Sequence, residues 1–173
     1  TMGDLSIGAG TGEVTFQSLV DDTVLTVAGS ATWALGGNTL HLESTGLDTR
    51  LAMSSGETLT VTGAGTFNTG ERPNNGTTGL WNVGGSTLDF QADILKGNER
   101  SVGQFGVVKM SAGQTYVHER NSGNTYANAW ELSGPGNVTF TNRFNQGTFI
   151  TGLVSGTAGI TYEDGGTVGG FLR

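Results

Sequence analysis

The sequence predicts an all-β protein whose short strands stack in successive coils, and two kinds of observation support this prediction. The first is a motif that begins at each of the three tryptophans of the chain. It reads Trp-Ala-Leu-Gly-Gly-Asn-Thr-Leu-His-Leu at residues 33–42, recurs at 81–90 and recurs more loosely at 130–140. The second is an alternation of apolar and polar residues with a period of two, broken by glycine-rich turns. Stacked coils place like residues over like, so this repetition favours a parallel β-solenoid.

Segments of three to five alternating residues, rich in threonine and valine, predict the individual strands, because a branched Cβ suits pleated and half-buried positions. Turn sequences such as Gly-Gly and Asn-Ser-Gly separate them. In chain order, the predicted strands are residues 5–7, 13–16, 23–27, 39–42, 58–61, 87–90, 115–117, 138–140 and 159–162. Residues 90–96, which Gly97 follows, predict a turn or two of helix, and helix is otherwise nearly absent.

A second set of internal matches shows that the repeat has no fixed period. Residues 25–33 match residues 59–67, and residues 51–59 match residues 108–116. The predicted unit is therefore a strand-turn piece with variable loops between copies. If the 48 residues between the first two tryptophans hold two coils, a coil has about 24 residues and the chain makes about seven short coils. The alternative is a β-sandwich or jelly roll, whose antiparallel strands need no repetition.

Length and composition restrict the class of protein. The 173 residues predict one domain, a single solenoid module over residues 1–173 that we expect to be a piece of a longer protein. Charged residues make up 13% of the chain and the net charge is −7, without a Lys or Arg cluster, so we expect no nucleic-acid partner and no anionic membrane partner. No apolar run is long enough for membrane insertion. The chain has no cysteine, which excludes disulfides and thiolate metal sites and is typical of exported bacterial proteins.

The tryptophan motifs, together with residues 132–140 and 149–161, resemble the autotransporter-associated β-strand repeat of bacterial surface proteins. That repeat has a similar pattern, an apolar-Ser-Gly-x-Gly-x-Leu stretch followed by Gly and Thr-Leu-x-Leu. The resemblance is strongest over residues 81–162, while residues 71–78 and 96–104 fit it only as loops. It implies a right-handed parallel β-helix in a large secreted or surface-displayed bacterial protein. It carries over no catalytic residue, because the repeat has none.

The ionisable residues form no recognisable catalytic or metal motif. His41 and His118 are the two histidines, and neither has Ser and Asp partners at a known triad spacing, so we expect both to be ordinary surface residues. The adjacent acids at residues 21–22 and 163–164 are expected to be solvated corners, since neighbouring residues on a strand point to opposite faces. We therefore expect no catalytic residues, no metal site and no cofactor. Calcium is the one possible ion, at the carboxylate and carbonyl corner of residues 163–166.

The aromatic residues permit two interpretations. If Trp33, Trp81 and Trp130 face outward, stacking aligns them as a platform for sugar rings. If they face inward, each plugs the corner of its coil. Each Trp stands two residues from an apolar Leu or Val and so shares its face, which favours the inward interpretation. For the outward one, the candidate ligand-binding residues are Trp81, Trp130, Tyr116, Tyr126, Asn124 and Asn128.

These observations predict a non-catalytic extracellular module, secreted or on the bacterial cell surface, for surface adhesion or polysaccharide (carbohydrate) binding. Its hydroxyl-rich and weakly charged surface suits a polysaccharide or cell-surface glycan as partner. One alternative is a purely structural passenger or spacer repeat. A second is a polysaccharide lyase or glycoside hydrolase that would use Asp89, Asp93 or Glu119. Open coil ends present unpaired strand edges, so we also expect weak end-to-end self-association through residues 1–16 or 152–173.

Overall fold

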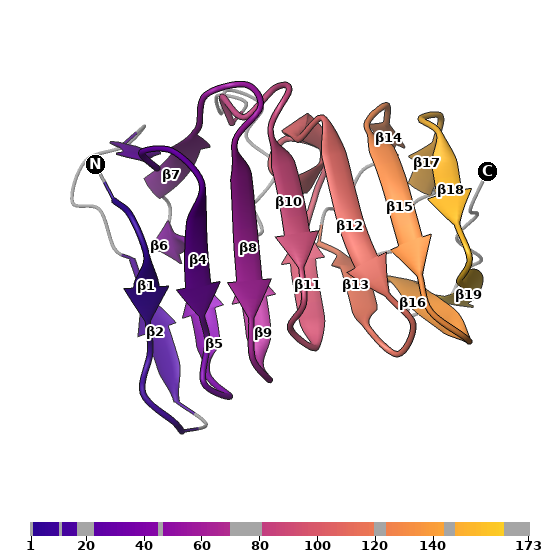
Figure 1. Ribbon diagram of the computed structural model, residues 1–173, viewed down its shortest axis with the longest axis horizontal. Helices are drawn as coiled ribbons and strands as arrows, with labels where there is room; N and C mark the ends of the chain where they lie inside the picture. Colours follow the sequence, from indigo (N-terminus) through magenta and orange to yellow (C-terminus); the bar gives the residue numbers. More distant parts are fainter. Residues whose placement is uncertain are drawn as a thin grey trace.

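The computed structural model describes residues 2–10, 12–16, 23–44, 47–69, 81–119, 124–143 and 148–164, which form a parallel β-solenoid (Figure 1). The first sheet consists, in spatial order, of β1 (Leu5–Ser6), β4 (Ala31–Ala34), β8 (Thr58–Thr62), β10 (Thr87–Phe90), β12 (Val107–Ser111), β15 (Ala129–Ser133) and β18 (Val154–Gly156). The second sheet consists of β2 (Glu13–Thr15), β5 (Thr39–His41), β9 (Thr66–Asn68), β11 (Ile94–Gly97), β13 (Thr115–His118), β16 (Asn137–Asn142) and β19 (Gly159–Asp164). Every pair within these two sheets is parallel, so the predicted fold class is confirmed and the antiparallel sandwich is not adopted.

Shorter strands form a third side of the coils. β3 (Thr23–Thr26) pairs in parallel with β7 (Leu47–Ala52), and β14 (Asn124–Tyr126) pairs in parallel with β17 (Thr148–Ile150). The short β6 (Glu43–Ser44) is antiparallel to β7, and a 3-10 turn, η1 (Val102–Gln104), precedes β12. A parallel bridge between Ala52 and Asn82 continues the third side between these two groups.

The strand register shows coils of unequal length. The separation between paired residues runs from 20 positions, for Thr87 and Val107, to 29 positions, for Thr58 and Thr87. The predicted coil of about 24 residues lies within this range. Each main sheet holds seven strands, and because the first and last strands only begin and end the stack, the number of full turns is somewhat below the predicted seven coils.

The tryptophan motif is used at two different corners of the coil. In residues 33–42 it joins β4 of the first sheet to β5 of the second through the Gly36-Gly37 turn. In residues 81–90 it starts beside Asn82 on the third side and ends in β10 of the first sheet. The 48-residue repeat therefore advances the chain by one full coil and two of the three corners of the next. This explains why the matches found in the sequence have no common period.

Inward side chains of successive coils form a continuous core. In the second sheet one column of paired residues is entirely apolar or aromatic and buried: Leu40, Phe67, Leu95, Tyr116 and Phe140. The residues on either side of this column point outward, which is the origin of the period-two pattern. Within the described residues this core extends through the whole stack.

All nine segments predicted as strands coincide with strands, four of them extending one residue past the strand end, but the predicted helix is wrong. Residues 87–90 form β10, and Ile94 begins β11, which lies between β9 and β13. Leu95 is fully buried, in register with Phe67 and Tyr116. Two strand edges with free hydrogen-bonding groups and an apolar column outweigh the weak helix propensity of so short a segment.

Candidate functional site: a buried polar corner

The three tryptophans lie in the core rather than on the surface. Trp33 and Trp130 are 0% exposed and Trp81 is 6% exposed. Trp33 packs edge-on against Phe67, with ring centroids 5.9 Å apart, and Trp81 packs against Phe105 at 6.3 Å. The inward interpretation is therefore correct, and an exposed tryptophan platform is wrong. Burying about 200 Å² of aromatic surface at each tryptophan contributes substantially to the free energy of folding, and a ring that faced solvent would lose this contribution.

The two candidate tyrosines belong to the same aromatic core. Tyr116 and Tyr126 are 1% and 0% exposed, and both rings contact Trp130, at centroid distances of 5.2 Å and 6.0 Å. Phe140 completes the group at 5.2 Å from Trp130. The structure thus brings together Trp130, Tyr116 and Tyr126 among the candidates, but as a packed cluster that no sugar ring can reach.

Of the two candidate asparagines, the structure describes the side chain of one. Asn128 is 7% exposed, and neither its side-chain nitrogen nor its side-chain oxygen has a hydrogen-bond partner. Asn124 begins β14, but its side chain is not among those described. Asn128 therefore does not present its amide on an open surface.

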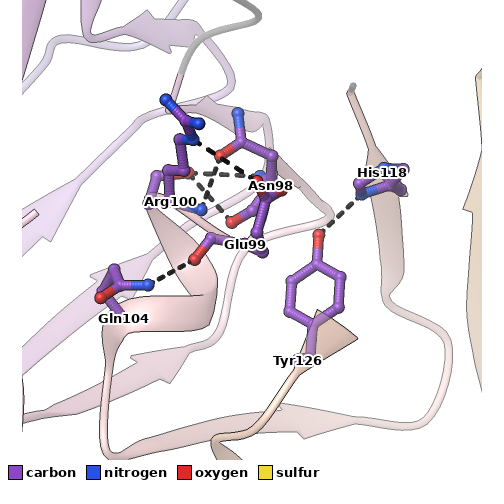
Figure 2. Close-up of polar contacts among 7 residues, drawn as sticks. Asn98, Glu99, Arg100, Gln104, His118 and Tyr126 are labelled. Carbon is purple, nitrogen blue, oxygen red and sulfur yellow. Dashed lines mark hydrogen bonds and ion pairs between the residues drawn. The ribbon is translucent and has the colours of Figure 1, made fainter. Parts of the chain in front are cut away.

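Sequence reasoning missed a buried polar group where β13 ends. The Tyr126 hydroxyl lies 2.6 Å from the Tyr116 hydroxyl and 2.7 Å from Nδ1 of His118, so the three side chains form one hydrogen-bonded chain. Figure 2 shows Tyr126 pointing from its own strand toward His118. His118 is 1% exposed, which corrects the expectation of an ordinary surface histidine. Its inward position at the end of an alternating strand was the available signal.

A buried carboxylate lies next to these three hydrogen-bonded side chains. Glu119 is 3% exposed and accepts a hydrogen bond from Nη1 of Arg143 at 2.8 Å, with Nζ of Lys96 at 3.8 Å. Main-chain hydrogen bonds between neighbouring coils continue beyond the strand ends here, because Glu119 N donates to Gly97 O and Arg143 N donates to His118 O. Three successive coils therefore meet in one ion-paired corner.

The loop before β12 closes the other side of this corner. Asn98 and Ser101 are buried, and the Ser101 hydroxyl lies 2.7 Å from that of Thr69 in the preceding coil. Gln104 Nε2 donates to Glu99 O and Arg100 N donates to Asn98 Oδ1 (Figure 2). Such bonds fix the loop's shape because the groups satisfy one another away from water.

The other carboxylates proposed for catalysis have structural partners. Asp93 Oδ2 accepts a hydrogen bond from Gly65 N, and Asp89 Oδ2 accepts one from Gln91 Nε2. Within the described residues, no group of three His, Asp or Glu side chains is placed to hold a metal ion. The calcium corner expected at residues 163–166 lies partly outside the described residues. In the described part of the chain, no helix is long and apolar enough to cross a membrane.

Burial raises the pKa of Tyr116 above its usual value; the negative charge of Glu119 raises it further, and the hydrogen bond with Tyr126 opposes both. An unfolded tyrosine ionises near pH 10, whereas folded Tyr116 keeps its proton. The contribution of Tyr116 to the free energy of unfolding is therefore constant below about pH 10. Above that pH the free energy of unfolding falls, by up to about 1.4 kcal/mol per pH unit for this group. Urea titrations between about pH 8 and pH 11 will show this fall, and Tyr116→Phe will reduce its slope. An unchanged slope in Tyr116→Phe would contradict the assignment.

Comparison of the chain with protein-family models, with curated proteins and with solved structures found no match.

Proposed function

We propose that this chain is a non-catalytic structural module, a rigid stretch of β-solenoid that holds apart the parts of a larger protein. The observation that carries the proposal is the position of the strands: β1 and β2 lie at one end of the stack, and β18 and β19 lie at the other (Figure 1). From β1 to β19 the described chain therefore runs from one end of the stack to the other. Six intervals between the seven strands, each about 4.8 Å, span about 29 Å.

The core supports rigidity over this distance. Parallel strands continue in register from coil to coil, and the aromatic side chains fill the interior rather than the surface. Close-packed interiors resist compression, and neighbouring coils hold one another in place. The resemblance to autotransporter-associated β-strand repeats and the absence of cysteine support a secreted or cell-surface setting in a bacterium.

Pairs of spin labels will test rigidity directly, since the chain has no native cysteine. Labels at Ser6→Cys and Ser155→Cys span six intervals, and labels at Thr60→Cys and Ser155→Cys span four. We expect narrow distance distributions whose centres scale with the number of intervals, about 29 Å and about 19 Å between backbones. The second pair is the internal control for label flexibility. Broad distributions, or centres that do not scale with the number of intervals, would refute a rigid spacer.

Polysaccharide binding is the second candidate, and one observation favours it. An outward column of the second sheet begins with Glu13 and continues with Thr39, Thr66, Thr115, Thr139 and Thr161, and Ile94 is the one apolar residue among these threonines. These half-buried threonines place neutral hydroxyls at the strand spacing of about 4.8 Å. A repeated, uncharged row of hydroxyls suits an extended neutral polysaccharide.

Affinity electrophoresis in gels that contain neutral polysaccharides will test the second candidate. If the threonine column binds, the protein is retarded, and Thr139→Lys abolishes the retardation. The matched control is Ser111→Lys, which places the same charge on the first sheet, away from the column. If the protein migrates without retardation in every gel, polysaccharide binding is refuted and the spacer stays as the proposed function.

A further inference from the structure

We propose that His118 makes the buried polar corner sensitive to acid: the corner is closed while the imidazole is neutral, and it opens locally when the imidazole takes up a second proton. This property goes beyond the spacer function and does not depend on it. It follows from the direction in which the hydrogen-bonded side chains of Tyr116, Tyr126 and His118 donate their protons. All three are buried, at 1%, 0% and 1% exposed, so each proton needs a partner within the protein.

The proton of Tyr116 sets this direction. Within the described residues, the Tyr116 hydroxyl has one hydrogen-bond partner, the Tyr126 hydroxyl at 2.6 Å. A buried donor is costly to leave unpaired, so Tyr116 donates and the Tyr126 oxygen accepts. The single proton of Tyr126 is then donated to Nδ1 of His118, 2.7 Å away (Figure 2). Nδ1 therefore carries no proton, and neutral His118 has its proton on Nε2.

A second proton on the imidazole does not fit this arrangement. It must go to Nδ1, because Nε2 already carries one, and Nδ1 then changes from an acceptor to a donor. The three side chains then bring three protons to two contacts, so one hydroxyl proton has no acceptor within the group. An unpaired donor inside an aromatic cluster is unfavourable. Opening the corner relieves this cost, because water then reaches the hydroxyl groups.

The charged groups around Glu119 do not favour an added positive charge. Glu119, the residue after His118, accepts a hydrogen bond from Arg143 at 2.8 Å and lies 3.8 Å from Nζ of Lys96. Arg143 follows β16 and Lys96 belongs to β11, the two strands that flank β13. Two cations thus already face this one carboxylate.

The other groups on the neighbouring elements are neutral or paired. Gly97 of β11 and Asn142 of β16, which are in register with His118, carry no charge. In the loop before η1, Glu99 and Arg100 pair with each other, Oε1 to Nε at 3.6 Å. β14 contributes Tyr126, which is uncharged in the acidic range. Within the described residues, then, no unpaired carboxylate is placed to hold an imidazolium at His118.

The pH range of the opening follows from histidine itself. An exposed histidine takes up a proton near pH 6.5, whereas the closed corner excludes that proton. Above about pH 6.5 the equilibrium between closed and open corner is therefore constant. Below it, each pH unit favours the open corner by up to about tenfold, because opening takes up one proton. Distant coils keep their own contacts, so the opening is local.

Amide hydrogen exchange of the whole chain, followed by NMR between about pH 7.5 and about pH 5 and corrected for the intrinsic rates, measures this opening. The reporting amides are Glu119 N, Arg143 N and Thr151 N, which donate to Gly97 O, His118 O and Tyr126 O. Their protection factors are expected to fall by up to about tenfold per pH unit below about pH 6.5. Leu35 N and Met53 N, which bond between coils elsewhere in the stack, are the internal controls and are expected to keep their protection.

His118→Asn separates this histidine from the carboxylates, since the amide oxygen of asparagine accepts from Tyr126 in place of Nδ1 and cannot be protonated in this range. The variant is expected to lose the pH dependence of the three reporting amides. His41→Asn is the matched control, because His41 is partly exposed and lies beside Glu13, 3.3 Å from Oε1. It is expected to keep the pH dependence of the wild type.

Nitrogen-15 NMR of the wild-type imidazole tests the proton arrangement without any substitution. At about pH 7.5 we expect Nδ1 of His118 to be unprotonated and Nε2 to carry the proton. A proton on Nδ1 at that pH would overturn the proposal. So would wild-type protection at the corner that does not change with pH, or a pH dependence that persists in His118→Asn.

Discussion

Replacing Trp130 with alanine is expected to lower the free energy of unfolding by about 3–5 kcal/mol. The indole is fully buried and contacts the rings of Tyr116, Tyr126 and Phe140, at centroid distances of 5.2, 6.0 and 5.2 Å. Because hydrogen-bonded coils on both sides hold the backbone, the cavity cannot collapse, and the effect should fall at the upper part of this range. Chemical denaturation followed by circular dichroism measures it. A loss below about 1 kcal/mol would contradict a packed core here.

Substitution by phenylalanine separates packing from hydrogen bonding. Trp33 Nε1 donates to Gly3 O at 3.1 Å, whereas Trp130 Nε1 is buried without a partner. A buried donor without a partner costs about 1–3 kcal/mol, and removing it recovers part of that free energy. Trp130→Phe is therefore expected to destabilise the protein less than Trp33→Phe does. The opposite order would show that the indole nitrogen of Trp130 is hydrogen-bonded in solution.

Gly36→Ala is expected to be the second strongly destabilising change, with a loss of about 2–4 kcal/mol. Gly36 has a φ of +63°, and a Cβ there would lie 2.5 Å from Ile7 O and 2.9 Å from Gly8 O in the preceding coil. The loss has two sources, the left-handed conformation and the collision with the main chain of the adjacent coil. The neighbouring carbonyls cannot move away without breaking the strand ladder.

Gly29→Ala provides the control for the conformational part. Gly29 has a similar φ of +73°, but a Cβ there would meet no atom within 4 Å. Its replacement should cost about 1–2 kcal/mol, the conformational contribution alone. Thermal or urea unfolding of both variants gives the difference, which measures how closely two coils approach. Equal losses would mean that the coils separate at this corner to accept a methyl group.

The alternation of apolar and polar residues was sufficient to predict the solenoid and nine of the nineteen strands that the structure describes. Thr39-Leu40-His41 and Thr58-Leu59-Thr60-Val61 display the period of two directly, and both form strands with buried leucines. Where the pattern is short or begins beside a turn, as in β11 and β14, local residues do not identify a strand. There the neighbouring coil decides, because it supplies both an unpaired edge and an apolar column.

The arrangement of the tryptophans and of the buried polar corner could not be derived in the same way. Trp33 and Trp81 begin the same motif, but they occupy different corners, because a strand-turn-strand piece fits wherever the coil bends. The contact between Glu119 and Arg143 joins residues 24 positions apart, and it depends on coil lengths that the sequence does not reveal. Sequence alone thus determines what each piece is, while stacking determines where it lies.

The unequal coils have a consequence for how the chain reaches its folded state. Every parallel strand pair joins residues 20 to 29 positions apart, and none of these pairs joins the two ends of the described chain. The entropy of closing a loop depends only weakly on its length over this range, so each new coil meets nearly the same barrier. Folding can nucleate at any coil and propagate to its neighbours. The most cohesive nucleus is then the coils around Trp130, where the largest aromatic cluster and the ion-paired corner lie together.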